Sequence, residues 1–152
     1  MRSPRPRSAR QRYPAGMAFD DIVHVLDETR VVAVITRRAD GTRVATPIWS
    51  MVVDGVPYLR SAYGASSWWY RHAISGREVE FVVGDGKIAE EDRAAALAMP
   101  SEPVALEPVP ADDPVQQAID RVLDAKYADE PDSIVPMKTP AALDCTLRVV
   151  AP

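Results

Sequence analysis

Residues 29–61 read TRVVAVITRRADGTRVATPIWSMVVDGVPYLRS, and this stretch decides the fold class. It is rich in β-branched residues, and within 42–53 the set Val44, Thr46, Ile48, Ser50 and Val52 alternates with a second set, which is the period-2 pattern of a strand. Two Asp-Gly pairs, at 40–41 and 54–55, favour tight hairpin turns because both residue types tolerate a positive φ. The stretch therefore predicts a meander, the unit from which small antiparallel barrels are built. Its three strands are expected over 29–37, 42–53 and 56–61.

The remaining sequence adds helices and three more strands. Apolar residues at i, i+3, i+4 and i+7 predict an amphipathic helix that starts at Phe19, and serine or Asp-Pro caps predict later ones. The predicted helices are 19–28, 68–74, a helical segment within 87–102, and 113–127; the later strands are 78–83, 103–109 and 142–150, with a loop over 129–140. The expected fold is mainly β with flanking helices, a six-stranded antiparallel barrel.

Composition indicates one domain. The chain has 152 residues and is 47% hydrophobic, and we assign the folded domain to residues 17–152. Residues 1–16 hold five arginines, three prolines and no acid, and they are predicted to be a disordered basic tail. Five of the 18 basic residues thus lie outside the domain, which keeps 13 against 22 acids and is not expected to bind nucleic acid. No apolar run reaches ~18 residues and no secretory leader is recognisable, so we expect a cytoplasmic protein without a membrane partner.

Several familiar sites are missing. The sequence lacks a Gly-x-Gly-x-x-Gly run, a phosphate loop, Cys-x-x-Cys and His-Glu-x-x-His. Its two histidines, His24 and His72, are too few for a histidine-rich metal centre, and no metal site is predicted. The single cysteine, Cys145, has no histidine near it in the sequence, which favours a buried structural thiol over a nucleophile.

The segment 60–72 concentrates groups that bind anions. The predicted third strand delivers Arg60 and Ser61 to a glycine-containing loop. Ser66 or Ser67 then caps a helix that carries Arg71, and a helix start and an arginine both offer N–H donors to phosphate oxygens. A structural interpretation stays open beside this one. In it the serines are only caps, the arginines pair with surface acids, and the tryptophans fill a core or a dimer interface.

Residues 32–49 and 58–70 resemble a family of bacterial proteins of unknown function, DUF2255, which is related to the deazaflavin-dependent nitroreductase-like and pyridoxamine-phosphate-oxidase-like split barrels. Segments 120–127 and 146–152 are also similar to that family. The resemblance implies a homodimeric split barrel that holds FMN or a deazaflavin (coenzyme F-420) in the cleft between subunits. The cofactor contacts that the resemblance implies are Arg43, Thr46, Pro47, Arg60, Ser61, Ser66, Ser67 and Trp68. Arg71 is expected to join them, because its guanidinium group can bind a phosphate.

These features predict a flavin- or deazaflavin-dependent oxidoreductase that acts on a small, largely hydrophobic substrate. Trp49, Trp68 and Trp69 are the expected substrate contacts, and Tyr63 and Tyr70 are the candidate catalytic residues. Two alternatives stay open. One is a non-catalytic split-barrel module that binds a small ligand or cofactor, and the other is a cofactor-free biosynthetic enzyme, an isomerase or cyclase, that uses the same cleft.

Overall fold

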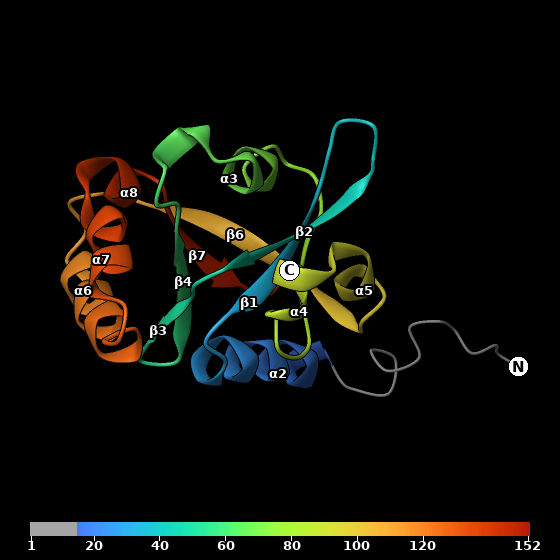
Figure 1. The fold of residues 1–152 in the computed structure, drawn as a ribbon, viewed down its shortest axis with the longest axis horizontal. Helices are drawn as coiled ribbons and strands as arrows, with labels where there is room; N and C mark the ends of the chain where they lie inside the picture. The colour runs from blue at the N-terminus through green and yellow to red at the C-terminus, as the bar shows by residue number, and fades with distance from the viewer. Residues whose placement is uncertain (1–14) are drawn as a thin grey trace, which may run out of the picture.

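The computed structural model describes residues 15–152, which form a seven-stranded antiparallel sheet with helices around it (Figure 1). The strands are β1 (Val32–Arg37), β2 (Arg43–Ile48), β3 (Met51–Val53), β4 (Val56–Arg60), β5 (Val79–Val82), β6 (Ser101–Val109) and β7 (Thr146–Val150). The helices are α2 (Ala15–Glu28), η1 (Gly64–Ser66), α3 (Trp68–Ala73), α4 (Ile88–Glu91), α5 (Arg93–Leu97), α6 (Val115–Lys126), α7 (Pro131–Ile134), η2 (Val135–Lys138) and α8 (Pro140–Asp144). The mainly β fold with flanking helices is confirmed, whereas the predicted count of six strands is wrong. The predicted basic tail, apart from its last two residues, lies outside the described residues.

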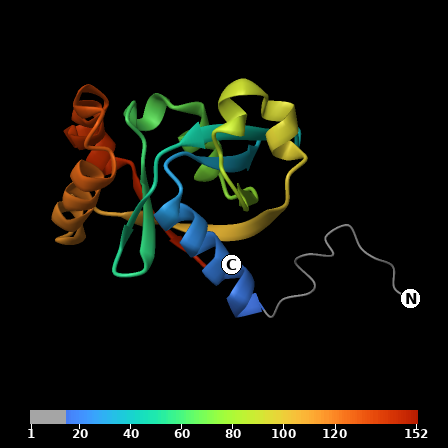
Figure 2. The same cartoon turned by 60° about the horizontal axis from the view of Figure 1, so that its bottom comes forward.

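The sheet curls into a half-barrel. Its strand order is β2-β1-β5-β6-β7-β4-β3, and β6 joins the two halves, because residues 101–104 pair with β5 and residues 105–109 pair with β7. α2 lies at one end of the half-barrel and α3 at the other (Figures 1 and 2). Ile22 from α2 and Tyr70 from α3 are buried in one core with Val34 and Phe81 of the strands. The two helices therefore close the interior that the curled sheet leaves open.

A two-residue link carries the chain from one edge of the sheet to the other. The sequence predicts one strand over 42–53, but pairing with β1 ends at Ile48, and Met51 starts β3 beside β4. Three residue steps span at most ~11 Å, so the two edge strands have to approach each other at Trp49 and Ser50. The predicted meander is therefore wrong, because its two hairpins lie at opposite edges of the sheet.

Polar contacts hold this link in place. Ser50 Oγ donates to the Leu26 carbonyl at 2.7 Å, and the Ser50 N–H donates to the Tyr127 hydroxyl at 3.1 Å. The Lys126 ammonium group donates to the carbonyls of Leu26 and Ser50 at 2.8 and 2.9 Å, and burial lowers the pKa of this lysine to about 8. The end of α6 is thus tied to the end of α2 and to the link between the sheet edges.

The tight turn predicted at residues 54–55 is confirmed. Asp54 and Gly55 have positive φ angles of 49° and 79°, which fits the tight turn between β3 and β4. Pro47 lies in β2, which is an edge strand. An edge strand tolerates proline, because it has no neighbouring strand on one side and needs no N–H donor there.

Residues 129–140, predicted as a loop, are largely helical. Pro131 and Pro140 occupy first-turn positions of α7 and α8, where a helix has no use for the missing N–H. The Thr139 hydroxyl accepts the Ala142 N–H at 3.2 Å and caps α8. The last strand consequently starts later than predicted, and Cys145 is a buried thiol between α8 and β7.

The helical segment predicted within 87–102 is confirmed as α4 and α5, although residues 101 and 102 belong to β6. Both short helices pack on the β1–β2 hairpin through buried alanines, among them Ala89 and Ala96. Within residues 15–152 no helix is long and apolar enough to cross a bilayer.

Candidate functional site

A cavity of about 970 Å³ lies between the β1–β2 hairpin and α3, and one residue of α5 joins its wall. The lining residues are Arg38, Ala39, Val44, Thr46, Ser67, Trp68, Trp69, Arg71, His72, Arg77 and Arg93. The hairpin forms one wall because β1 and β2 stay paired along their whole length, from Val32–Ile48 to Arg37–Arg43. Figure 1 shows α3 beside the outer end of this hairpin.

The cavity is cationic. Four arginines line it, no aspartate or glutamate does, and within the described part of the chain none of the four forms an ion pair with a carboxylate. Arg77 Nε donates to the Arg37 carbonyl at 2.8 Å, which orients one guanidinium group. In contrast, Arg37 and Arg43 outside the cavity are paired with acids, since both lie within 4 Å of Glu80.

The short helix α3 turns three polar or aromatic groups toward the cavity. Trp68, Arg71 and His72 are spaced i, i+3 and i+4, so they share one side of the helix. The Arg71 guanidinium carbon lies 4.8 Å from the centre of the Trp68 ring, which is a cation–π distance, and Trp68 is 68% exposed. Tyr70 is buried and absent from the lining, whereas Trp69 is buried and still contributes to the cavity wall. The cavity therefore has an accessible aromatic surface beside its arginines.

His72 is a site residue that the sequence analysis missed. Its Nδ1 lies 3.4 Å from the hydroxyl oxygen of Thr36, a buried residue of β1. Burial lowers the pKa of His72 first, and the positive charges of Arg77, Arg38 and Arg71 lower it further. A neutral imidazole can donate or accept one proton, so His72 is the titratable group that the cavity offers a ligand. The sequence offers one signal for it: His72 lies four residues after Trp68, so both side chains are expected on the same side of the predicted helix.

The structure brings together five of the predicted site residues. Thr46 of β2 faces Ser67, Trp68, Trp69 and Arg71 across the cavity. Thr46 and Arg71 were predicted as cofactor contacts and Trp69 as a substrate contact. The predicted site also combined a β2 residue with the start of α3, but the other residues of the cavity wall differ from the other predicted contacts.

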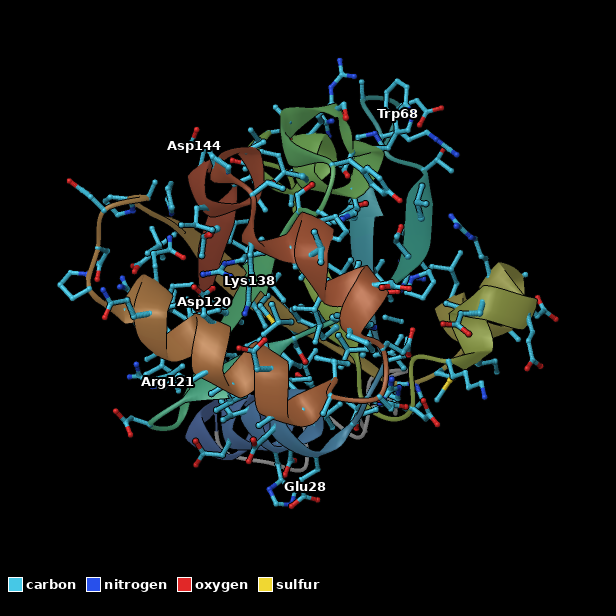
Figure 3. All side chains as sticks on the ribbon, turned by 60° about the vertical axis from the view of Figure 1, so that its left-hand side comes forward. Glu28, Trp68, Asp120, Arg121, Lys138 and Asp144 are labelled. Carbon is cyan, nitrogen blue, oxygen red and sulfur yellow. The ribbon has the colours of Figure 1, made fainter. Side chains whose placement is uncertain are left out.

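Arg60, predicted to bind a phosphate, does not line the cavity. Its guanidinium group is fully buried and donates to Asp120 Oδ1 at 2.6 Å, to Gln116 Oε1 at 2.6 Å and to the Met137 carbonyl at 3.2 Å. Figure 3 shows Asp120 on α6, well apart from the labelled Trp68 on α3. Arg60 thus fastens α6 and η2 to β4, and the prediction of an anion contact is corrected.

The serine caps also differ from the prediction. Ser61 is buried and its hydroxyl donates to the Gly64 carbonyl at 2.6 Å, while Ser66 donates to the Tyr63 carbonyl at 2.7 Å. Ser67 occupies the N-cap position of α3, but its side chain makes no capping bond. Because α3 has only six residues, we assign no anion site to its N-terminus.

The other predicted residues lie outside the cavity wall. Tyr70 is buried, and burial, followed by a hydrogen bond with Cys145, raises its pKa to about 12. Trp49 stacks on Tyr127 with ring centres 3.8 Å apart, in the core beneath α6. Three more members of the predicted site, Tyr63, Pro47 and Arg43, are likewise absent from the lining. Tyr70 and Trp49 are therefore packing residues in this fold.

The described residues contain no cluster of groups that could hold a metal ion.

Fold and site together define a small antiparallel half-barrel protein with a cationic, aromatic-lined cavity beside its first hairpin. The chain belongs to the DUF2255 family, described as an uncharacterized protein conserved in bacteria, whose model matches residues 22–149. No curated protein matches the chain.

Two solved structures share the fold. The conserved hypothetical protein Rv2991 from Mycobacterium tuberculosis superposes with a TM-score of 0.51 at 20% identity, over 85% of this chain and 76% of that one. A heme binding protein from Mycobacterium smegmatis superposes with a TM-score of 0.51 at 16% identity, over 91% of this chain and 51% of that one. This chain thus spans about half the length of the second protein, and at such identities the likeness concerns the fold alone.

Proposed function

We propose that the protein binds a planar aromatic cofactor with an acidic group in the cavity between the β1–β2 hairpin and α3. The proposed cofactor is a flavin or deazaflavin, and the proposed activity is an oxidoreduction of a small, largely hydrophobic substrate. The observation that carries the proposal is one cavity that combines an exposed tryptophan with four arginines, none of which forms an ion pair within residues 15–152.

The lining residues suit such a group. A volume of about 970 Å³ falls within the ~300–1,000 Å³ usual for cofactor and drug-sized ligands. Guanidinium groups match phosphate or carboxylate oxygens with paired donors, so Arg38, Arg71, Arg77 and Arg93 can hold the acidic end. Trp68 offers a face on which an aromatic ring can stack, and Val44 adds an apolar contact.

A bound flavin or deazaflavin supplies hydride-transfer chemistry in its own ring system. The residues of this chain would bind the acidic end, orient the ring against Trp68 and exclude water from the apolar part of the cavity. His72 can hold or release a proton at Nε2, because Nδ1 is the nitrogen that faces Thr36. Neither Tyr63 nor Tyr70 takes that role in this proposal.

Heme binding is the second candidate. A neutral imidazole is a common ligand of heme iron, and His72 places one in the cavity wall beside arginines that suit carboxylates. The similarly folded Mycobacterium smegmatis protein is a heme binding protein. In this alternative the protein is a binding module, and no redox turnover is required.

Absorbance titrations separate the two candidates. We expect FMN or a deazaflavin to bind saturably, and Arg71→Gln to weaken that binding roughly 10- to 100-fold, because one charge-assisted hydrogen bond is worth about 1.5–3 kcal/mol. The matched control is Arg121→Gln, on the exposed side of α6 (Figure 3), which should leave the affinity unchanged. Hemin binding that is lost in His72→Ala, with no flavin binding, would favour the heme candidate. Equal effects of both arginine variants would contradict a ligand site in this cavity.

A homodimer is part of the proposal. Tyr63, Trp68 and Ile74 are 77%, 68% and 53% exposed, and they lie within twelve residues of sequence on and around α3. Large apolar side chains grouped on a surface favour a protein interface. We expect the protein to sediment as a dimer and Ile74→Asp to give a monomer. Val135→Asp, at an equally exposed apolar residue of η2 (66%), should leave the dimer intact; a monomeric wild-type protein would refute the interface.

A further inference from the structure

Three arginines from different segments line the same cavity as His72. Arg71 precedes it on α3, Arg38 follows β1, and Arg77 lies in the loop after α3. Burial lowers the pKa of the imidazole first, and the charges of Arg77, Arg38 and Arg71 lower it further. The hydroxyl of the buried Thr36 lies 3.4 Å from Nδ1 and fixes the orientation of the ring. His72 is thus held in the wall of the cavity, in a cluster that carries three positive charges.

No carboxylate among the described residues forms an ion pair with this cluster. Glu78 and Glu80 are held by Arg37 at 3.0 and 3.2 Å, and Asp92 caps α5. Asp40 accepts an N–H inside the hairpin turn; its hydrogen bonds with Thr42 and then the charge of Arg38 lower its pKa, so it offsets part of the charge of Arg38. Arg93, also from α5, adds a fourth cation to the cavity wall. A site with four arginines and no carboxylate in ion-pair contact with them is suited to an external anion.

We infer that the arginine cluster binds a tetrahedral dianion, such as the phosphate of a cofactor or free phosphate or sulfate, and that His72 takes up a proton when the dianion binds. The inference deepens the proposed function and rests on the same cavity. It names the acidic group of the ligand and makes its binding dependent on pH.

The coupling follows from electrostatics. Burial and the charges of three guanidinium groups disfavour a protonated His72 in the protein without an anion. A bound dianion reverses the local charge and offers an acceptor to Nε2–H, and an opposite charge at close range raises a pKa by about 1–3. Since the bound state has the higher histidine pKa, the affinity for the anion rises as the pH falls through that pKa and levels off below the pKa of the free state.

An NMR titration of the two imidazoles tests this directly. The chain has only His24 and His72, and the exposed His24, 3.0 Å from Glu28 on α2, is an internal control. We expect sulfate, which does not titrate in this range, to raise the pKa of His72 by about 1 or more. Sodium chloride at equal ionic strength should raise it less, and His24 should respond equally to both salts. An equal response of His72 to both salts would overturn the inference.

Variants make the test sharper. Arg71→Gln should raise the pKa of His72 in the absence of sulfate, because a repelling charge is removed, and should reduce the further rise that sulfate causes. Arg121→Gln should change neither quantity. The wild-type protein should bind sulfate about tenfold more tightly at pH 5 than at pH 8, and His72→Gln should make this affinity independent of pH. An unchanged pH dependence in His72→Gln would refute the role of this histidine.

FMN and riboflavin identify the source of the anion. If FMN raises the pKa of His72 and riboflavin does not, the cluster holds the phosphate of the cofactor. If sulfate alone raises it, the anion site exists and the proposed cofactor is wrong. Flavin binding that leaves the pKa of His72 unchanged, together with no effect of sulfate, would refute the inference while the proposed function stands.

Discussion

Replacing Arg60 with methionine is expected to lower the free energy of unfolding by about 3 kcal/mol, the low end of the range for breaking a buried ion pair, because the Asp120 side chain is 35% exposed. The guanidinium group is fully buried and serves Asp120, Gln116 and the Met137 carbonyl at once. Its loss leaves the Asp120 carboxylate without its partner, and Gln116 Oε1 keeps only a long contact, 3.4 Å, with the Thr146 hydroxyl. Methionine keeps much of the side-chain volume, so the effect reports on polar contacts more than on a cavity.

Urea denaturation of Arg60→Met beside Lys138→Met measures this effect. Lys138 pairs with Asp124 at 2.6 Å, but this pair is largely exposed (Figure 3), and its removal should cost less than ~1 kcal/mol. Ligand affinity of folded Arg60→Met should match that of the wild type, because Arg60 is outside the cavity. A variant with normal stability and weakened flavin binding would show that the buried position of Arg60 is wrong.

Gly86→Ala is expected to lower the free energy of unfolding by about 3 kcal/mol or more, at the upper end of overpacking effects. An added Cβ at this position would lie 2.2 Å from the Ala33 nitrogen and 2.2 Å from the Val32 carbonyl carbon. Both are backbone atoms of β1, so no side-chain rotation can relieve the clash. The Gly86 N–H also donates to the Val31 carbonyl at 2.9 Å, and this bond would be lost as the loop moves away.

Gly55→Ala is the control, because its Cβ would meet no atom within 4 Å and only its positive φ of 79° is unfavourable. We expect a cost of about 1–2 kcal/mol there, measured by the same denaturation. Gly86 precedes α4 and α5, so displacing its loop should also move Arg93 in the cavity wall. If both variants lose the same free energy of unfolding, the close approach of residue 86 to β1 is not the reason why this position needs glycine.

Local patterns explain which parts of the fold the sequence predicts well. A run of β-branched residues identifies β1, alternation identifies β5, and the Asp-Gly pairs identify both hairpin turns, because these signals depend on neighbouring residues only. The order of the strands depends on contacts that no local pattern records. Ser50 leaves the strand because Leu26, Lys126 and Tyr127 offer it partners, and these lie 24 to 77 residues away.

The candidate site could be predicted only in part, because some of its residues follow from local patterns and others depend on long-range contacts. Trp68, Trp69 and Arg71 follow from their concentration on one helix, and Thr46 followed from the family resemblance. Arg60 has the residue type and position of an anion ligand, yet Asp120 and Gln116 on α6 occupy it, and no spacing in the sequence shows this. His72 was overlooked because its contact with Thr36 spans 36 positions.

The place of β7 between β6 and β4 has a consequence for synthesis of the chain on the ribosome. Residues 146–150 are translated after the other six strands, yet among the described residues β4 and β6 are connected in the sheet only through them. The nascent polypeptide can form its early hairpins within the first sixty residues, but it cannot complete the sheet until these five residues have left the exit tunnel. Until then the facing edges of β4 and β6 are open, and binding by a chaperone would protect them from pairing with other chains.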